Sequence, residues 1–310
     1  MKGVRAAVVG AGGFIGTNLC DYLLGRGVAV RALSRGWIRP PPAGADTVLT
    51  ADANDREAIE EVIADSSCVV VLSHGLLPGS ELEKAGRDML DSLSISFHLI
   101  EQCARRRIRL IYLSSGGTVY GPDVPVPTRE DAPCNPINMY GVSKLATENV
   151  LRVYGRQCGL DYRVLRVSNP YGPWQLGRNG QGVIGAWLRQ ALSGREIEVW
   201  GDGSVVRDYI YVDDLLRAIL AAIEYEGSDR IFNIGSGRGE SLRNVLDVIQ
   251  QLCDVRVRFG ESRPVDVPMS VLDISRASAE LKWAPVVQLQ RGIDETLRWM
   301  SEWTATREMV

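Results

Sequence analysis

The chain has 310 residues, 45% of them hydrophobic, which is enough to build one or two domains with large cores. The net charge of −3, with both signs dispersed, gives no basis for binding nucleic acid or an anionic membrane. There is no membrane-spanning apolar run and no signal peptide, so we expect a cytoplasmic protein. Six scattered cysteines and only two histidines, His74 and His98, argue against a disulfide framework, a metal site and a serine hydrolase.

Short apolar runs alternate with helical patterns through the first half of the chain. Helices are predicted at residues 14–25, 55–65, 86–106 and 138–157. Strands are predicted at residues 4–9, 28–33, 47–50, 68–72, 110–113 and 160–167. Continuous apolar strands that alternate with helices indicate a parallel sheet covered on both faces. We therefore expect an α/β fold built on a Rossmann-type doubly wound parallel sheet.

The pattern changes after residue 168. Loops rich in Gly, Asn and Pro precede a predicted helix at 183–193 and a strand at 197–200. The segment 208–225 is typical of a strand followed by a helix, and 231–234 of a strand; both could return to the first sheet. We therefore divide the chain into two units. Residues 1–168 with 208–236 form the dinucleotide-binding domain, and residues 169–207 with 237–310 form a smaller α/β substrate-binding domain.

A glycine loop follows the first predicted strand. Gly10, Gly13 and Gly16 have G-x-x-G-x-x-G spacing, and Phe14 and Ile15 lie within the same turn. Glycines let the backbone approach a pyrophosphate closely, and the helix that begins here offers free N–H groups and a positive dipole end. The loop therefore predicts dinucleotide binding.

The ends of the next strands supply further candidates for cofactor contacts. Ser34 and Arg35 end the second strand, where an acidic residue would favour NAD. Arg35 either points to solvent or faces a 2′-phosphate, so this position alone leans towards NADP. Asp52 either contacts the adenine amino group or caps the following helix. The remaining cofactor-binding candidates are Ala53, Leu72, Ser73, Tyr140 and Lys144.

Tyr140 and Lys144 are the strongest catalytic candidates. Residues four apart lie on one face of a helix, and a cation beside a phenol lowers the phenol pKa from about 10. Lysine is rare here: of the 35 basic residues only four are lysine. Arginine is bulkier and planar, so it does not replace a compact ammonium group. Tyr140 is therefore expected to take a proton from a sugar hydroxyl while hydride leaves the same carbon.

The glycine loop and this Tyr-x-x-x-Lys pair together resemble the short-chain dehydrogenase/reductase superfamily. Four further segments resemble its extended branch, the nucleotide-sugar epimerases and dehydratases: residues 113–121, 166–173, 201–214 and 263–266. The resemblance implies that Asn169, Arg207 and Arg263 hold a diphosphate and that Trp200 stacks on the nucleotide base. Arg178 and Val183 complete the expected substrate-binding set.

The sequence departs from this branch at two positions that bear on the reaction. The family usually has a Ser or Thr where this chain has Gly116, so Thr118 or Ser115 must replace that hydroxyl, and we favour Thr118. Dehydratases of the branch carry an Asp-Glu pair at the positions of Gly117 and Thr118, and this chain has no acid at either. The resemblance therefore implies a 4-epimerase with bound NAD. A 4,6-dehydratase or an NADP-dependent reductase is the alternative.

Within the branch, the chain resembles bacterial UDP-glucuronate and UDP-glucose 4-epimerases of polysaccharide or antibiotic pathways, the moenomycin pathway among them. The resemblance implies a UDP-sugar substrate. UDP-glucuronate is preferred, with Arg178, Gln175 or Thr118 as candidate partners of its carboxylate. The family also implies a homodimer formed through the helices at 86–106 and 138–157.

Overall fold

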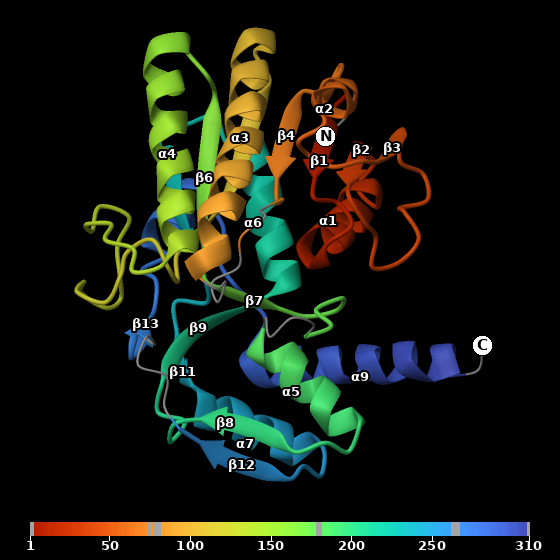
Figure 1. Cartoon of the computed structure of the whole chain (residues 1–310), viewed down its shortest axis with the longest axis vertical. Helices are drawn as coiled ribbons and strands as arrows, with labels where there is room; N and C mark the ends of the chain where they lie inside the picture. Colours follow the sequence, from red (N-terminus) through yellow and green to blue (C-terminus); the bar gives the residue numbers. More distant parts are fainter. Residues whose placement is uncertain (1–2, 74–75, 77–81, 178–181, 262–266, 309–310) are drawn as a thin grey trace.

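The structure is a computed structural model that describes residues 3–73, 76, 82–177, 182–261 and 267–308. A seven-stranded parallel sheet forms the larger part of the molecule (Figure 1). Its strand order is β10-β6-β5-β4-β1-β2-β3. The strands are β1 Arg5–Val9, β2 Ala29–Ser34, β3 Thr47–Thr50, β4 Cys68–Val71, β5 Arg109–Ser115, β6 Tyr162–Val167 and β10 Ile231–Ile234.

Both faces of this sheet are covered, which explains why its central strands are apolar throughout. In β1, Ala6 and Val8 belong to one buried core, and Ala7 and Val9 belong to the other. Helices α1 (Phe14–Leu24) and α6 (Val212–Glu224) cover the first core, and α2 (Arg56–Ile63), α3 (Leu82–Arg106) and α4 (Met139–Cys158) cover the second. The predicted fold class is confirmed.

The order of the strands defines where a ligand can bind. From β1 the chain runs to β2 and β3 on one side, and it then crosses back to β4, β5 and β6 on the other side. The carboxyl ends of β1 and β4 therefore flank the point at which the strand order reverses. In doubly wound sheets the ligand crevice lies at this edge.

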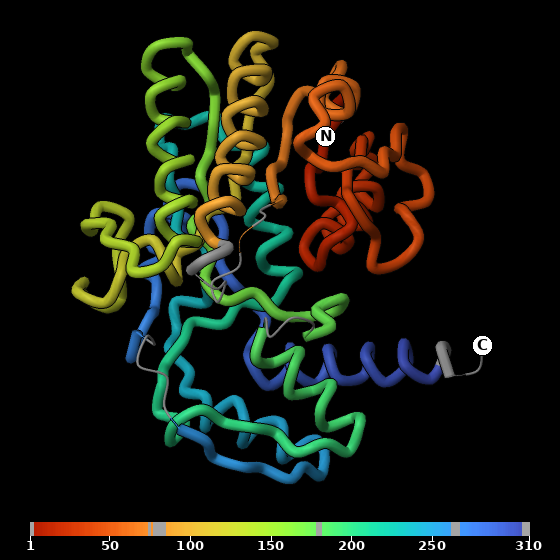
Figure 2. The backbone as a smooth tube through the Cα atoms, viewed as in Figure 1, coloured from red at the N-terminus to blue at the C-terminus, as the bar shows by residue number. Residues whose placement is uncertain are grey.

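A smaller part lies below the sheet in Figure 1. Its core contains Trp187, Ile197, Val199 and Ile249, which are buried among helices α5, α7 and α9. Figure 2 shows the backbone passing repeatedly between the two parts. The elements of the smaller part are β7 Asn169–Tyr171, α5 Val183–Leu192, β8 Ile197–Trp200, β9 Val206–Tyr211, β11 Gly239–Ser241, α7 Leu242–Leu252, β12 Val257–Gly260, β13 Met269–Ser270 and α9 Leu289–Glu308.

Two segments are placed differently from the sequence-based division of the chain. Strand β9 does not join the main sheet; it pairs with β7, β11 and β13, so the expectation that the strand at 208 returns there was wrong. Helix α8 (Ser275–Glu280) packs on the first core through Ala277, although its residues were assigned to the second domain. Buried Asp208 contributes to this arrangement, because its carboxylate accepts hydrogen bonds from the backbone of Ser236 and Leu272.

Candidate active site

The glycine loop joins β1 to α1 at the carboxyl edge of the main sheet. A Cβ atom at Gly10 would lie 2.7 Å from the Ser73 nitrogen, and one at Gly16 would lie 2.3 Å from the Gly10 oxygen, so packing excludes side chains at both positions. Gly13 differs, because it is exposed and the nearest atom to such a Cβ is 3.6 Å away. Gly13 begins α1, and no side chain caps this end of the helix. Free amides beside an open glycine suit a pyrophosphate, so these residues fit a dinucleotide.

The other cofactor candidates lie along the same edge. Ser34 ends β2, Ala53 follows β3, and Leu72 and Ser73 follow β4. The backbone nitrogens of Leu72 and Ser73 both donate to the Val9 oxygen, at 2.9 and 3.1 Å. This keeps the segment after β4 against the glycine loop. The structure thus brings these candidates together, and their contact with a cofactor stays a prediction.

Arg35 directly follows β2 at this edge of the sheet. Its side chain is 84% exposed, and its Nη1 lies 3.7 Å from the Asp52 carboxylate, so it is both solvent-facing and ion-paired. Asp52 accepts a hydrogen bond from the backbone of Asn54, whereas Asp55 provides the N-cap of α2. The helix-capping role considered for Asp52 therefore belongs to Asp55.

Tyr140 and Lys144 lie in the first two turns of α4. Asn138 begins this helix by accepting a hydrogen bond from the Gly141 nitrogen at 2.8 Å. Lys144 is only 3% exposed and donates from Nζ to the Leu113 oxygen at 2.7 Å. Its Nζ lies 5.6 Å from the centre of the Tyr140 ring. The expected pair is therefore assembled beside the carboxyl end of β5.

The pKa values of this pair differ from the sequence-based expectation. Burial lowers the pKa of Lys144 to about 7, against the opposing charge of Glu148. Burial also raises the pKa of Tyr140 to about 12, against a hydrogen bond with Ser115 that lowers it. The protein groups alone therefore do not bring the tyrosine pKa towards neutrality, because loss of water around the phenolate outweighs the hydrogen bond with Ser115.

The hydroxyl beside Tyr140 is that of Ser115, which ends β5. The Thr118 Oγ1, the favoured candidate, is buried and has no hydrogen-bond partner among the described residues. Gly116 cannot carry the hydroxyl usual in the family. A Cβ atom there would lie 2.6 Å from the Leu272 Cδ1 and 3.0 Å from the Arg166 oxygen. Leu272, far away in sequence, thus fills the space of the missing side chain.

A buried ion pair holds α4, the helix of Tyr140 and Lys144, to strand β6. Arg166 of β6 donates to the Glu148 carboxylate from Nη2 at 2.6 Å and from Nε at 3.1 Å. The Ser114 hydroxyl also donates to this carboxylate, and Arg166 reaches the Tyr120 hydroxyl at 2.9 Å. Sequence reasoning missed this network. Glu148 lies four residues after Lys144, and this spacing was the available signal.

Apart from the ligand crevice at the carboxyl edge of the main sheet, a pocket of about 480 Å³ lies in the smaller part of the molecule. We call it the second pocket. Four of the predicted substrate-binding residues line it: Asn169, Val183, Trp200 and Arg207. The other two, Arg178 and Arg263, lie outside the described residues. Helix α5 begins at this pocket with Gly182 and without a side-chain cap, so its positive end faces the cavity.

Gln175, a candidate partner of the sugar carboxylate, also lines this pocket, as do Gln190, Glu198 and Tyr209, which were not predicted. The Oε1 atoms of both glutamines and the Tyr209 hydroxyl are buried, without hydrogen-bond partners among the described residues. Buried polar groups of this kind normally have a hydrogen-bond partner. A polar ligand bound in the pocket would provide it. Tyr209 was recognisable in principle, because it lies two residues after Arg207 and so on the same face of β9.

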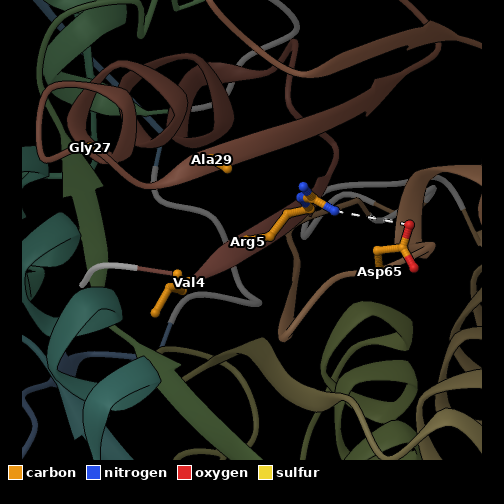
Figure 3. A pocket seen from close by; sticks show the side chains of 6 residues that line it. Val4, Arg5, Gly27, Ala29 and Asp65 are labelled. Carbon is orange, nitrogen blue, oxygen red and sulfur yellow. Dashed lines mark ion pairs between the residues drawn. The ribbon is translucent and has the colours of Figure 1, made fainter.

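Another pocket, of about 300 Å³, lies at the opposite edge of the main sheet (Figure 3). It is lined by residues at the amino ends of β1 and β2, where Arg5 faces Asp65 across 4.0 Å. Neither the glycine loop nor the Tyr140 cluster contributes to it, so we assign it no part in the reaction. Among the described residues there is no cluster able to hold a metal ion and no helix that could span a membrane.

These features are typical of a dinucleotide-binding protein with a buried Tyr-Lys pair beside the main sheet and a separate pocket in the smaller part. Residues 6–235 match the NAD dependent epimerase/dehydratase family, and the chain belongs to that family. The sequence-based family assignment and its expected cofactor, NAD, are therefore confirmed.

Known proteins similar to this chain include epimerases and a reductase. The Thermotoga maritima UDP-glucose 4-epimerase, solved with UDP-glucose, is 31% identical, with a TM-score of 0.90 over 97% of this chain and 100% of that one. MoeE5, solved with UDP-glucuronic acid and NAD, is 27% identical, with a TM-score of 0.83 over 96% of this chain and 99% of that one. The Escherichia coli dTDP-4-dehydro-6-deoxyglucose reductase is 34% identical over 233 residues, covering 74% of this chain and 73% of that protein.

Proposed function

We propose that the chain is a UDP-sugar 4-epimerase that inverts C4 of UDP-glucuronate or UDP-glucose through a 4-keto intermediate. The observation that carries the proposal is an acid/base pair, Tyr140 and Lys144, without an acid at Gly117 or Thr118. Such a site can move one proton at one carbon, whereas loss of water from the sugar needs further acid/base groups.

In the proposed reaction, Tyr140 takes the proton of the sugar 4-hydroxyl and later returns it. Ser115, hydrogen-bonded to Tyr140, orients the two oxygens, and Lys144 provides positive charge beside the phenolate. NAD, when bound, would supply the hydride acceptor and donor for C4. The glycine loop and the end of β4 would hold that cofactor.

The second pocket would anchor the nucleotide diphosphate. Arg207 and the uncapped start of α5 supply positive charge for the phosphates, and half-exposed Trp200 offers a ring face for the base. A sugar held only through its diphosphate can turn and present its other face to Tyr140. Rotation of this kind is what inversion at C4 requires.

For the sugar itself, we keep the preference for UDP-glucuronate. The sequence motifs support it. MoeE5 has been solved with UDP-glucuronic acid and with UDP-glucose, and the Thermotoga maritima relative supports UDP-glucose. We expect kcat/KM for UDP-glucuronate to exceed that for UDP-glucose by about tenfold, because a charge-assisted hydrogen bond to the carboxylate adds roughly 1.5–3 kcal/mol. Epimerisation followed by NMR without added cofactor measures both. A higher value for UDP-glucose would reverse the preference.

The reductase alternative is favoured by the Escherichia coli relative. It predicts stoichiometric consumption of added NADPH, and a dehydratase predicts a product lighter by one water. An epimerase does neither, because its cofactor is restored in every cycle. Either result in place of epimerisation would overturn the proposal.

We also propose a homodimer formed through α3 and α4. Exposed apolar side chains on both helices support it: Leu90 is 69% exposed, Phe97 42% and Val153 45%. Light scattering of the purified protein is expected to give twice the chain mass. A monomer mass at micromolar concentration would contradict this proposal.

A further inference from the structure

A row of contacting aromatic and charged side chains connects the two parts of the molecule beside the second pocket. The Arg39 guanidinium lies 5.1 Å from the centre of the Trp174 ring and pairs with Asp21 of α1. The Trp174 ring meets Trp299 of α9 edge-on, with the ring centres 4.8 Å apart. Trp303, one turn further along α9, stacks with Trp299 and also lies 6.1 Å from Trp174. We call Arg39, Trp174, Trp299 and Trp303 the interdomain clasp.

One end of the clasp is fixed to the cofactor loop. The segment that carries Arg39 packs on the glycine loop, where the Ile38 nitrogen donates to the Gly12 oxygen at 3.2 Å. A Cβ atom at Gly12 would lie 2.0 Å from the Gly36 oxygen, so the two segments are in close contact. Asn18 of α1 adds a second link, because its side-chain amide donates to the Pro173 oxygen at 2.8 Å. In Figure 1 the segment after β7 lies between α1 and α9.

The other end of the clasp borders the substrate pocket. Gln175, the neighbour of Trp174, lines that pocket and donates to the Pro170 oxygen at 2.8 Å. A Cβ atom at Gly182 would lie 2.4 Å from the Gln175 side chain, and one at Gly185 would lie 2.4 Å from the Gln175 oxygen. Gln175 therefore determines where the first turn of α5 lies, and this turn also lines the pocket.

The backbone of Trp174 is itself unusual. Its φ of 71° lies in the left-handed region, which is unfavourable for any residue with a Cβ atom. A residue with such a backbone conformation persists only where the surrounding structure holds it in place. Strained residues are frequent at ligand-binding sites. Here the surroundings are Arg39 on one side of the ring and the α9 tryptophans on the other.

We propose that Arg39 and Trp174 are positioning residues for the nucleotide sugar. The clasp fixes the position of residues 172–177 and of the start of α5 relative to the domain that carries the glycine loop and Tyr140. This inference rests on the proposed function of the second pocket as the UDP site. The clasp touches neither the reacting carbon nor the acid/base pair, so its loss should affect substrate binding and leave the chemical step intact.

The test compares Trp174→Leu and Arg39→Met with wild type, using steady-state epimerisation and calorimetric binding of UDP. KM and the UDP Kd are expected to rise about tenfold in both variants, while kcat and bound NAD stay within about twofold, because the strength of a cation–π contact corresponds to about twofold to thirtyfold in an equilibrium constant. Trp174→Phe and Arg39→Lys, which keep the ring and the charge, should recover most of the binding. Arg39→Met serves as the milder variant, since it retains the apolar stem of the side chain.

The matched control is Arg26→Met. Arg26, in the turn that follows α1, also stacks on an aromatic ring: it lies 3.5 Å from the centre of the Tyr22 ring of α1, within one domain. Its KM and UDP Kd should equal those of wild type. Unchanged KM and UDP Kd in both clasp variants would overturn the inference, and so would equal losses in kcat and bound NAD. Wild-type protein that binds UDP without epimerising any UDP-sugar would refute the proposed function alone, because the UDP Kd still tests the clasp.

Discussion

Replacement of Tyr140 by phenylalanine is expected to lower kcat by about 10³-fold or more, because general acid/base catalysis contributes roughly 10²–10⁴-fold and no second group nearby is arranged to replace it. Ser115 is hydrogen-bonded to Tyr140, but a serine hydroxyl is a far weaker acid than a phenol, so its alkoxide is not populated to act as the base. Lys144 is engaged with the Leu113 oxygen. The proton at the sugar oxygen therefore has no other route with comparable driving force.

The same variant should keep its fold and its NAD. The Glu148 carboxylate is held by Arg166 and Ser114, which the substitution leaves in place, and the glycine loop lies on a different element. Epimerisation assays measure kcat, and mass spectrometry of the nucleotide released on denaturation measures bound NAD separately. Tyr154→Phe, on the same helix, is the matched control and should retain wild-type kcat. Substantial turnover by Tyr140→Phe would show that another group handles the proton.

Removing the Glu148 carboxylate is expected to destabilise the protein by about 3–5 kcal/mol, the usual cost of leaving one member of a buried ion pair without its partner. In Glu148→Ala the Arg166 guanidinium would lose its bonds at 2.6 and 3.1 Å and would stay buried beside Tyr120. The free-energy cost of burying an unpaired charge is far larger than the gain from the apolar area of an alanine.

Urea unfolding at fixed NAD concentration measures this loss, because a ligand that binds the folded state shifts apparent stability. Asp131→Ala is the matched control. Asp131 and Arg129 form an exposed ion pair at 3.3 Å, and pairs of this kind contribute at most about 1 kcal/mol. If Glu148→Ala unfolded at the same urea concentration as wild type, Arg166 would have to find other partners, and the network would not stabilise α4.

Local patterns in the sequence were enough to predict the main sheet and the first elements of the site. The glycine loop and the Tyr140–Lys144 pair depend on short-range spacing, and the structure places each on the predicted element. The apolar strands likewise needed no tertiary information, since strands covered on both faces are apolar throughout. Strand β9 was assigned to the wrong sheet, because its sequence specifies a strand but not the strand that will pair with it.

The sequence by itself therefore determined the α/β class, the glycine loop and the placing of Tyr140 and Lys144 on one helix, because helical and strand periodicity bring these residues together within one element or its neighbour. Tertiary structure decided the rest. Leu272 fills the space beside Gly116, Ser115 and not Thr118 meets Tyr140, and burial sets both pKa values. These outcomes depend on contacts between distant segments and on the exclusion of water from the folded interior, which no local pattern encodes.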